Sequence, residues 1–177
     1  MTNEQYTSPP SSSNGRPEKA RLHRREVERP RWTSPPRVGL VYSAENWALI
    51  EPLVNELRYE LTDNYNFSPV NIRITQTESI HEIPLFISHS HQRSDIVFAL
   101  GVALKSSATY EQRLVDQLTQ RIAAISAPGR LPVFDCIMVR DDEMHAQAKG
   151  DAERMEIVQS WARRAIDTYV MLCKPAA

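Results

Sequence analysis

Hydrophobic residues recur along this chain with two spacings that alternate. Residues 38–42 and 96–100 are short, continuous apolar runs, typical of strands covered on both faces. Residues 70–74 alternate apolar with polar side chains, which indicates a strand with one exposed face near a sheet edge. A further apolar run over 131–139 predicts another buried strand. Four strands are therefore expected.

The apolar residues between these strands recur at steps of three and four, as on one face of an amphipathic helix. Asp141 and Asp142 are expected to cap one more short helix that ends at Gly150. Alternating strands and helices require right-handed crossovers and a parallel sheet covered by helices on both faces. The sequence therefore predicts an α/β three-layer sandwich with a four-stranded parallel sheet. The helical segments are 50–61, 83–87, 114–125 and 153–172.

The first 36 residues follow neither spacing. Half of the 12 prolines and almost no aliphatic residues fall there, which predicts a disordered Ser/Pro/Arg-rich arm over 1–36 and a compact domain over 37–177. Residues 1–37 hold eight basic and four acidic residues, a net charge of +4, so the rest of the chain carries about −5. Such an arm either stays solvated or contacts nucleic acid, an acidic partner or an anionic surface.

Cysteine usage and apolar content place the chain inside the cell. Cys136 and Cys173 give neither a disulfide framework nor a metal-binding spacing. No apolar run approaches the ~18 residues of a membrane span, and no signal peptide is recognisable. A mitochondrial transit peptide is the one targeting alternative, and four glutamates in the arm argue against it. A cytoplasmic protein is expected.

The loop after the strand at 96–100 is a candidate binding site, because open α/β sheets bind ligands at the carboxyl ends of their strands. Its polar residues would form an anion-binding loop, with Tyr110, His81 and Lys149 around it. The same residues are also typical of a polar turn between a strand and a helix, and both interpretations stay open. The loop residues are Lys105, Ser106, Ser107 and Thr109.

Several short segments carry a family resemblance. Residues 37–41 read Arg-Val-Gly-Leu-Val and are followed by Asn46, residues 82–84 read Glu-Ile-Pro, and residues 101–105 read Gly-Val-Ala-Leu-Lys. In this order and spacing, over residues 37–172, the chain resembles the lumazine synthases of riboflavin biosynthesis, most closely their fungal branch. The resemblance implies a flavodoxin-like fold, no cofactor, no metal, and pentamers or larger closed shells with sites between subunits.

The resemblance also marks where the family binds a ribitylamino-uracil and a four-carbon ketone phosphate. The aromatic residue that stacks on the pyrimidine falls on Glu45, and the catalytic histidine falls on Tyr110. The second stacking aromatic falls on Asp135 unless Phe134 has shifted by one position. The phosphate-binding glycine, threonine and arginine fall on Ser106, Ala108 and Lys149. The implied substrate-binding set also contains Asn46, Trp47, Ile80, His81 and Glu82.

Two functions follow. One is a catalytically degenerate lumazine synthase-like protein that is retained as a self-assembling oligomer. The other is an active transferase, either a slow lumazine synthase or one with an altered substrate. The family holds its two reactants side by side, so proximity supplies most of the acceleration. Stacking of a base on an aromatic ring contributes about 1–3 kcal/mol, and the loss of that ring at Glu45 favours the degenerate form.

Overall fold

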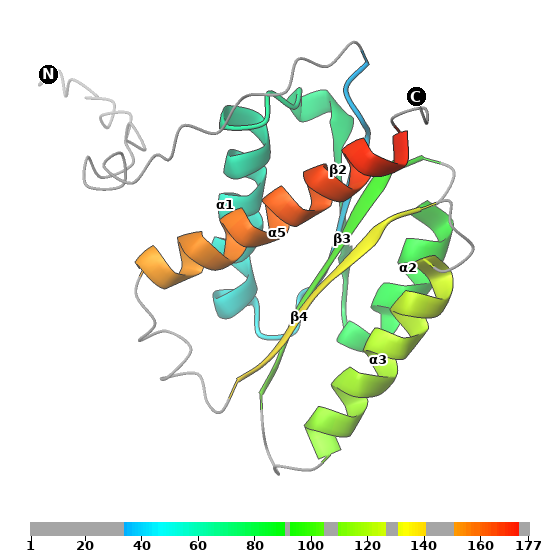
Figure 1. Ribbon diagram of the computed structural model, residues 1–177. Helices are drawn as coiled ribbons and strands as arrows, with labels where there is room; N and C mark the ends of the chain where they lie inside the picture. The colour runs from blue at the N-terminus through cyan, green and yellow to red at the C-terminus, as the bar shows by residue number, and fades with distance from the viewer. Residues whose placement is uncertain (1–33, 91–92, 105–109, 127–130, 141–150, 174–177) are drawn as a thin grey trace, which may run out of the picture.

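The structure is a computed structural model that describes residues 34–90, 93–104, 110–126, 131–140 and 151–173 of the 177-residue chain (Figure 1). Two short 3-10 helices, η2 (Pro69–Asn71) and η3 (Ile80–Glu82), flank the second strand. The main elements, in chain order, are β1 (Val38–Ser43), α1 (Trp47–Asp63), β2 (Ile72–Thr77), α2 (Ile83–Ser90), β3 (Ile96–Leu104), α3 (Tyr110–Ser126), β4 (Val133–Arg140) and α5 (Asp151–Cys173).

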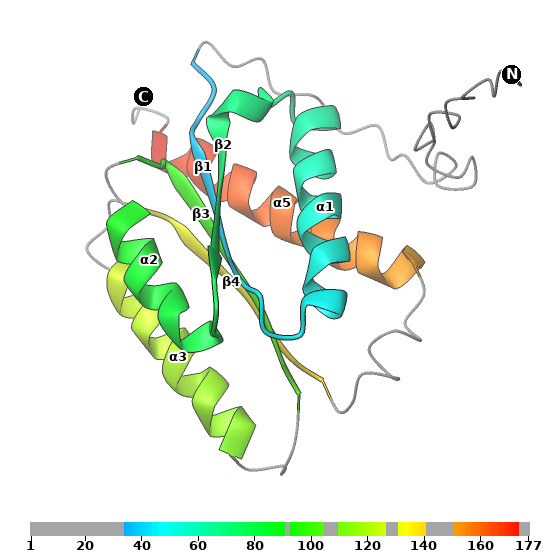
Figure 2. The ribbon, with the colours of Figure 1, turned by 180° about the vertical axis from the view of Figure 1, so that it is seen from behind.

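The four strands form one parallel sheet in the order β2-β1-β3-β4. Helices α1 and α5 cover one face of this sheet, and α2 and α3 cover the other, as the two opposite views show (Figures 1 and 2). The predicted three-layer α/β sandwich with a four-stranded parallel sheet is therefore confirmed, and the arrangement is flavodoxin-like.

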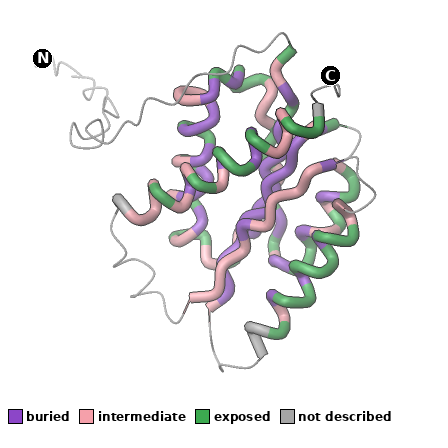
Figure 3. Tube along the Cα trace, viewed as in Figure 1, coloured by how far each residue is buried: buried purple, intermediate pink, exposed green. Residues whose placement is uncertain are grey.

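Each face of the sheet has its own hydrophobic core. Under α1 and α5, Leu40 and Phe98 of the sheet pack against the stripe of α1 that the helical spacing predicts, and the stripe is fully buried. Under α2 and α3, Val41 and Val97 pack against Ile83. Strand β3 runs between β1 and β4 and is buried from Ile96 to Ala103, which explains its continuous apolar sequence (Figure 3). The buried stripe of α1 is Ile50, Leu53, Val54, Leu57 and Leu61.

The second strand lies later in the chain than the sequence predicts. Val70, expected in the strand, belongs to η2 and is 89% exposed, because Pro69 starts a 3-10 turn in which its fixed φ is accommodated. The strand then continues to Thr77, through residues expected to be loop, because Thr77 pairs with Ser43 of β1. Its predicted place at a sheet edge is confirmed.

The last strand is less buried than predicted. It begins at Val133, and only Cys136 among its eight residues is fully buried. The physical reason is its place in the sheet, since β4 pairs with β3 on one side and forms the second edge. Burial raises the pKa of the Cys136 thiol well above its usual range, so the thiol stays protonated at neutral pH.

Some predictions concern residues outside the described ranges. These are the short helix over 141–150, the anion loop over 105–109 and the arm over 1–36, of which only Ser34, Pro35 and Pro36 are described. The division of the chain into an arm and a domain therefore stays a prediction. Within the described residues, no helix is long and apolar enough to cross a membrane.

Candidate functional site

The predicted site residues that the structure describes gather mainly where β1 and β2 end. Residues 43–47 follow β1 and residues 77–82 follow β2, and we call these two segments together the β1–β2 corner. The backbone N–H of Ala44 donates a hydrogen bond of 2.7 Å to the carbonyl of Thr77, which joins the two segments. The corner lies at the carboxyl ends of the strands, the edge where open α/β sheets bind ligands.

Asn46 fixes the entry into α1. It has a left-handed backbone (φ 58°), which asparagine tolerates better than most residues. Its side-chain amide donates to the carbonyl of Val102 at 2.8 Å, and its own carbonyl accepts from Leu49 at 2.9 Å. The Asn46 side chain therefore ties the β1–α1 turn to β3, and this bond occupies one of its donors.

Glu45 reaches from the first segment of the corner to the second. Its carboxylate accepts hydrogen bonds from the backbone N–H of Ile80 and from the hydroxyl of Ser79, both at 3.3 Å. Its own backbone N–H donates to the Ser43 hydroxyl at 3.1 Å, which holds the turn. A carboxylate that accepts from a backbone N–H at a helix start is favourably placed, because the free N–H groups there carry partial positive charge.

Glu82 satisfies the next donors of the same segment. Its carboxylate accepts hydrogen bonds from the backbone N–H of Glu78 at 3.0 Å and from that of Ser79 at 3.4 Å. The Ser79 hydroxyl accepts from the backbone N–H of His81 at 3.4 Å. This is a capping box at the start of η3. Together with Glu45, it leaves each of the four backbone N–H groups from Glu78 to His81 with an acceptor inside the chain.

The charged side chains of the corner are mainly glutamates. Residues 43–47 and 77–82 contain Glu45, Glu78 and Glu82 but no lysine or arginine, and His81 is exposed. A ligand that presents an acceptor or an anion to the 78–81 backbone must therefore displace a carboxylate and meet its negative charge. The corner is suited to closing its own backbone rather than to holding a phosphate.

One aromatic side chain stays accessible here. Trp47 is 40% exposed, and its ring centroid lies 5.4 Å from that of Tyr42 with the ring planes tilted by 30°. The Tyr42 hydroxyl donates to the Gln76 side chain at 3.0 Å, which fixes the ring below Trp47. An exposed indole supported from behind is a surface on which a flat ring can stack.

Ile80 contributes only its backbone to the corner. Its side chain is 2% exposed and lies over Gly101, where an added Cβ would meet Ile80 Cγ2 at 2.9 Å. Gly101 is therefore the position that lets η3 approach β3 closely. The backbone N–H of Ile80, which a ligand would need, is the one that Glu45 holds.

Phe134 and Asp135 lie apart from the corner within one chain. Phe134 is near the start of β4, at the opposite end of the sheet, and its ring centroid is 5.8 Å from that of Phe98 in the core. Asp135 accepts from the Thr119 hydroxyl of α3 at 2.6 Å and from the backbone N–H of Ile137 at 2.9 Å. The structure does not bring either residue together with Glu45, Asn46 and Trp47.

The remaining predicted residues are not placed by the structure. Tyr110 is the first residue of α3, and only its backbone is described. The anion-binding and proton-transfer roles therefore stay predictions. Within the described ranges, no group of three or more His, Cys, Asp or Glu side chains is arranged to hold a metal ion. The residues outside those ranges are Lys105, Ser106, Ser107, Thr109 and Lys149.

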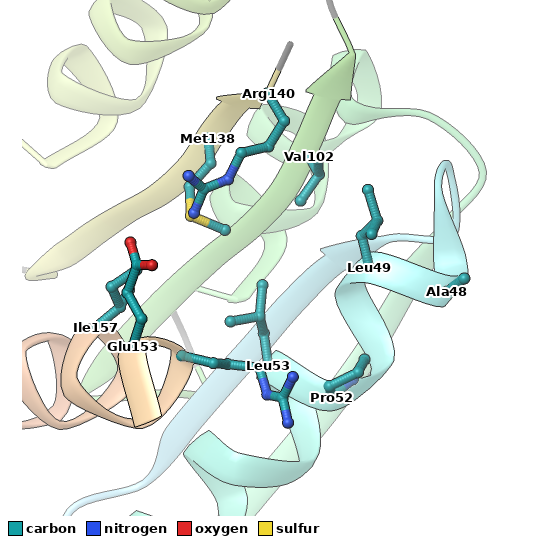
Figure 4. Close-up of a pocket in the computed structure, with 10 residues that line it drawn as sticks. Ala48, Leu49, Pro52, Leu53, Val102, Met138, Arg140, Glu153 and Ile157 are labelled. Carbon is teal, nitrogen blue, oxygen red and sulfur yellow. The ribbon is translucent and has the colours of Figure 1, made fainter. Parts of the chain in front are cut away.

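Sequence reasoning missed a pocket of about 220 Å³ between α1, the ends of β3 and β4, and the start of α5 (Figure 4). None of the predicted site residues lines it. Its walls are mainly apolar, and its charged lining residues are Arg140, Glu153 and Arg154. One signal for it was present in the sequence, because Arg140 is a basic residue at the carboxyl end of the last apolar run.

Comparisons with known proteins agree with the fold. A sequence model of the 6,7-dimethyl-8-ribityllumazine synthase family matches residues 35–173. The chain is 26% identical over 110 residues to the 6,7-dimethyl-8-ribityllumazine synthase of Mycobacterium avium (strain 104), covering 62% of this chain and 67% of that protein. The enzyme of the same name from Mycolicibacterium paratuberculosis gives the same identity and coverage. Because the family match spans nearly the whole sandwich, the chain belongs to the 6,7-dimethyl-8-ribityllumazine synthase family.

Proposed function

We propose that this chain is a catalytically degenerate member of the family, fungal-like and cytoplasmic, retained for its ability to assemble with copies of itself. One observation carries the proposal. The carboxylate of Glu45 stands where the resemblance places a stacking aromatic, and it is bonded to the backbone N–H of Ile80 instead of being directed at a ligand. The backbone N–H of Ile80 is thus already bonded within the chain.

A glutamate at position 45 affects both the surface on which a pyrimidine would stack and the backbone N–H of Ile80. Stacking of a pyrimidine on an aromatic ring contributes about 1–3 kcal/mol, and a carboxylate at that place supplies no such surface. A ligand acceptor that replaced Glu45 at Ile80 would exchange one hydrogen bond for another of similar strength, so it gains little from the exchange. Since the family's reaction depends on holding two reactants together, weaker holding lowers the rate directly.

Assembly is supported by the apolar side chains that one chain leaves exposed. Leu85 of α2 is 58% exposed, and Met171 and Leu172 at the end of α5 are 76% and 63% exposed. Contiguous exposed apolar side chains commonly mark surfaces that other chains cover, and Met171 and Leu172 are neighbours in the chain. A pentamer or a larger closed shell is the assembly that the family resemblance implies, and it does not require an active site.

The second candidate function is an active lumazine synthase that is slow or takes an altered substrate. Trp47 favours it, because an exposed indole two residues after Glu45 offers an aromatic surface close to the expected position. In that form the protein would condense a ribitylamino-uracil with a four-carbon ketone phosphate, using Trp47 for stacking and Tyr110 in place of the histidine.

One experiment separates the two. The full chain is incubated with both family substrates while lumazine absorbance is followed, and the mass of the same sample is measured in solution. Absence of lumazine from a sample of at least pentameric mass supports the degenerate form. Turnover above the uncatalysed rate contradicts it and supports the enzyme, whereas an inactive monomer contradicts the assembly role.

A further inference from the structure

We propose that the pocket between α1 and α5 binds a small organic anion with an apolar body, such as an aryl or short alkyl carboxylate or phosphate. The pocket shares no residue with the β1–β2 corner. The proposal therefore goes beyond the assembly role, and it stands or falls separately from it.

Seven of the ten residues that line the pocket are apolar. Leu53 of α1 and Val102 of β3 are 5% and 1% exposed and belong to the core under α1 and α5. Leu49 lies beside them on α1, and Met138 of β4 faces them from the sheet (Figure 4). A methionine side chain adapts its shape to an apolar ligand. The volume of about 220 Å³ admits one ring or a short chain.

Arg140 supplies the group that would hold the anion. It is the last residue of β4, it is partly buried, and its side chain extends along the pocket toward Met138 (Figure 4). Among the described residues, its guanidinium has one hydrogen-bond partner, the Met138 sulfur at 3.3 Å. A thioether is a weak acceptor, and a guanidinium has five N–H donors in a planar fork that matches a carboxylate or a phosphate.

The other charges at the pocket set the preferred charge of the ligand. Glu153 and Arg154, on the first turn of α5, contribute one negative and one positive charge. With Arg140 the lining carries a net charge of +1, and the start of a 23-residue helix adds a favourable field for an anion. The lining thus favours a ligand with one anionic group over a neutral or cationic one.

The test uses the full assembled chain and four probes: benzoate, phenyl phosphate, benzyl alcohol and inorganic phosphate. Ligand-detected NMR titrations give the affinity of each probe. Benzoate or phenyl phosphate should bind at least tenfold more tightly than both benzyl alcohol, which lacks the charge, and inorganic phosphate, which lacks the apolar body. The stronger of the two aryl anions identifies the preferred anionic group.

Two substitutions connect that binding to the pocket. Arg140→Met keeps an unbranched apolar side chain but removes the guanidinium, and it should weaken binding of the preferred anion at least tenfold. Arg163→Met is the control, because it removes an equal charge from an exposed part of α5, and it should leave the affinity unchanged. Arg163 Nε lies 3.9 Å from Asp167 Oδ2. Ala48→Phe places a ring into the pocket from an exposed position and should also weaken binding tenfold, which decides the question if Arg140→Met does not fold.

The proposal is overturned if neither aryl anion binds, or if benzyl alcohol binds as tightly as they do. Equal losses in Arg140→Met and Arg163→Met would show that overall charge, not the pocket, attracts the anion. If the protein makes lumazine and also passes these binding tests, the proposal of a catalytically degenerate protein is wrong and the pocket proposal stands.

Discussion

The carboxylate of Glu45 accepts a hydrogen bond of 3.3 Å from the backbone N–H of Ile80, 35 residues further along the chain. This bond joins the loop after β1 to the start of η3, and the Ser79 hydroxyl strengthens it with a second bond to the same carboxylate oxygen. Because Glu45 is exposed, water still solvates its charge, so the bond costs little desolvation. Glu45 therefore makes a structural contact between two loops that are distant in the sequence.

The first prediction is that Glu45→Ala lowers the free energy of unfolding by about 0.5–1.5 kcal/mol, the usual net value of lost hydrogen bonds. Urea denaturation measures the change. The control is Glu51→Ala, an exposed glutamate of α1, which should change the free energy by less than about 0.5 kcal/mol. Equal effects of the two substitutions would show that the Glu45 bonds do not stabilise the corner.

The second prediction is that Glu45→Phe increases the affinity for a ribityl-substituted pyrimidine. It supplies a stacking surface worth about 1–3 kcal/mol and releases the N–H of Ile80, so a gain of roughly 5- to 150-fold is expected. A fluorescence titration through the nearby tryptophan measures it.

The matched control for this gain is Glu51→Phe, which adds the same ring on α1, outside the corner. If both variants bind the pyrimidine as the natural chain does, the corner is not a degenerate form of the family's pyrimidine site. Combining Glu45→Phe with Tyr110→His tests whether turnover returns along with binding.

The sequence predicts the sandwich well because hydrophobic spacing records burial directly. The buried stripe of α1 and the apolar run of β3 are both in the structure as expected. The sequence pattern is a weaker guide to the position of each strand in the sheet. The run at 131–139 is mainly apolar, with Pro132 and Asp135 inside it, and it predicts a buried strand. Strand β4 is nevertheless half-exposed because it lies at an edge of the sheet.

The candidate site is harder to read from the sequence, because its geometry depends on contacts between distant residues. The family resemblance predicts an aromatic residue at the position of Glu45, but only the structure shows that the Glu45 carboxylate reaches Ile80. The pocket has the same character. Arg140 and Leu49 are 91 positions apart in the printed sequence, and they converge only when α1 packs on the face of the sheet that contains β4.

The third prediction concerns acid stability at the other end of the sheet. The Asp95 carboxylate accepts from the backbone N–H of Arg37 at 2.8 Å and from its guanidinium at 2.9 and 3.2 Å. Hydrogen bonds from the Arg37 side chain, with its charge, hold the pKa of Asp95 below the usual value. The folded pKa is therefore lower than the unfolded one, so this contribution to stability is present above the unfolded pKa and is lost as the pH falls through the folded pKa.

Asp95→Asn should remove this dependence. The free energy of unfolding of the variant, measured by urea denaturation from pH 7 down to pH 3, should fall less steeply than that of the natural chain. Asp167→Asn is the control, because its contact with Arg163 is long, at 3.9 Å, and both side chains are mostly exposed. If the free energy of unfolding falls equally steeply with decreasing pH in Asp95→Asn and in the natural chain, the Arg37 contact does not stabilise the fold.

The last prediction is that Gly101→Ala destabilises the protein by about 1–3 kcal/mol and loosens the β1–β2 corner. The added Cβ would lie 2.9 Å from Ile80 Cγ2, so either β3 or η3 must shift, and overpacking of this kind has that cost.

Ile80→Ala removes the clashing atom and leaves a cavity of its own, so each single variant should be less stable than the natural chain. The double variant should be more stable than the sum of the two losses predicts, because the Cβ of Ala at position 101 fills part of the space that Ile80 vacates. Urea denaturation of all four proteins gives the coupling free energy, and a value within about 0.5 kcal/mol of zero would show that the two positions do not interact. Since the backbone N–H of Ile80 is the donor to Glu45, Gly101→Ala should also reduce the loss caused by Glu45→Ala, which connects the packing of β3 to the closure of the corner.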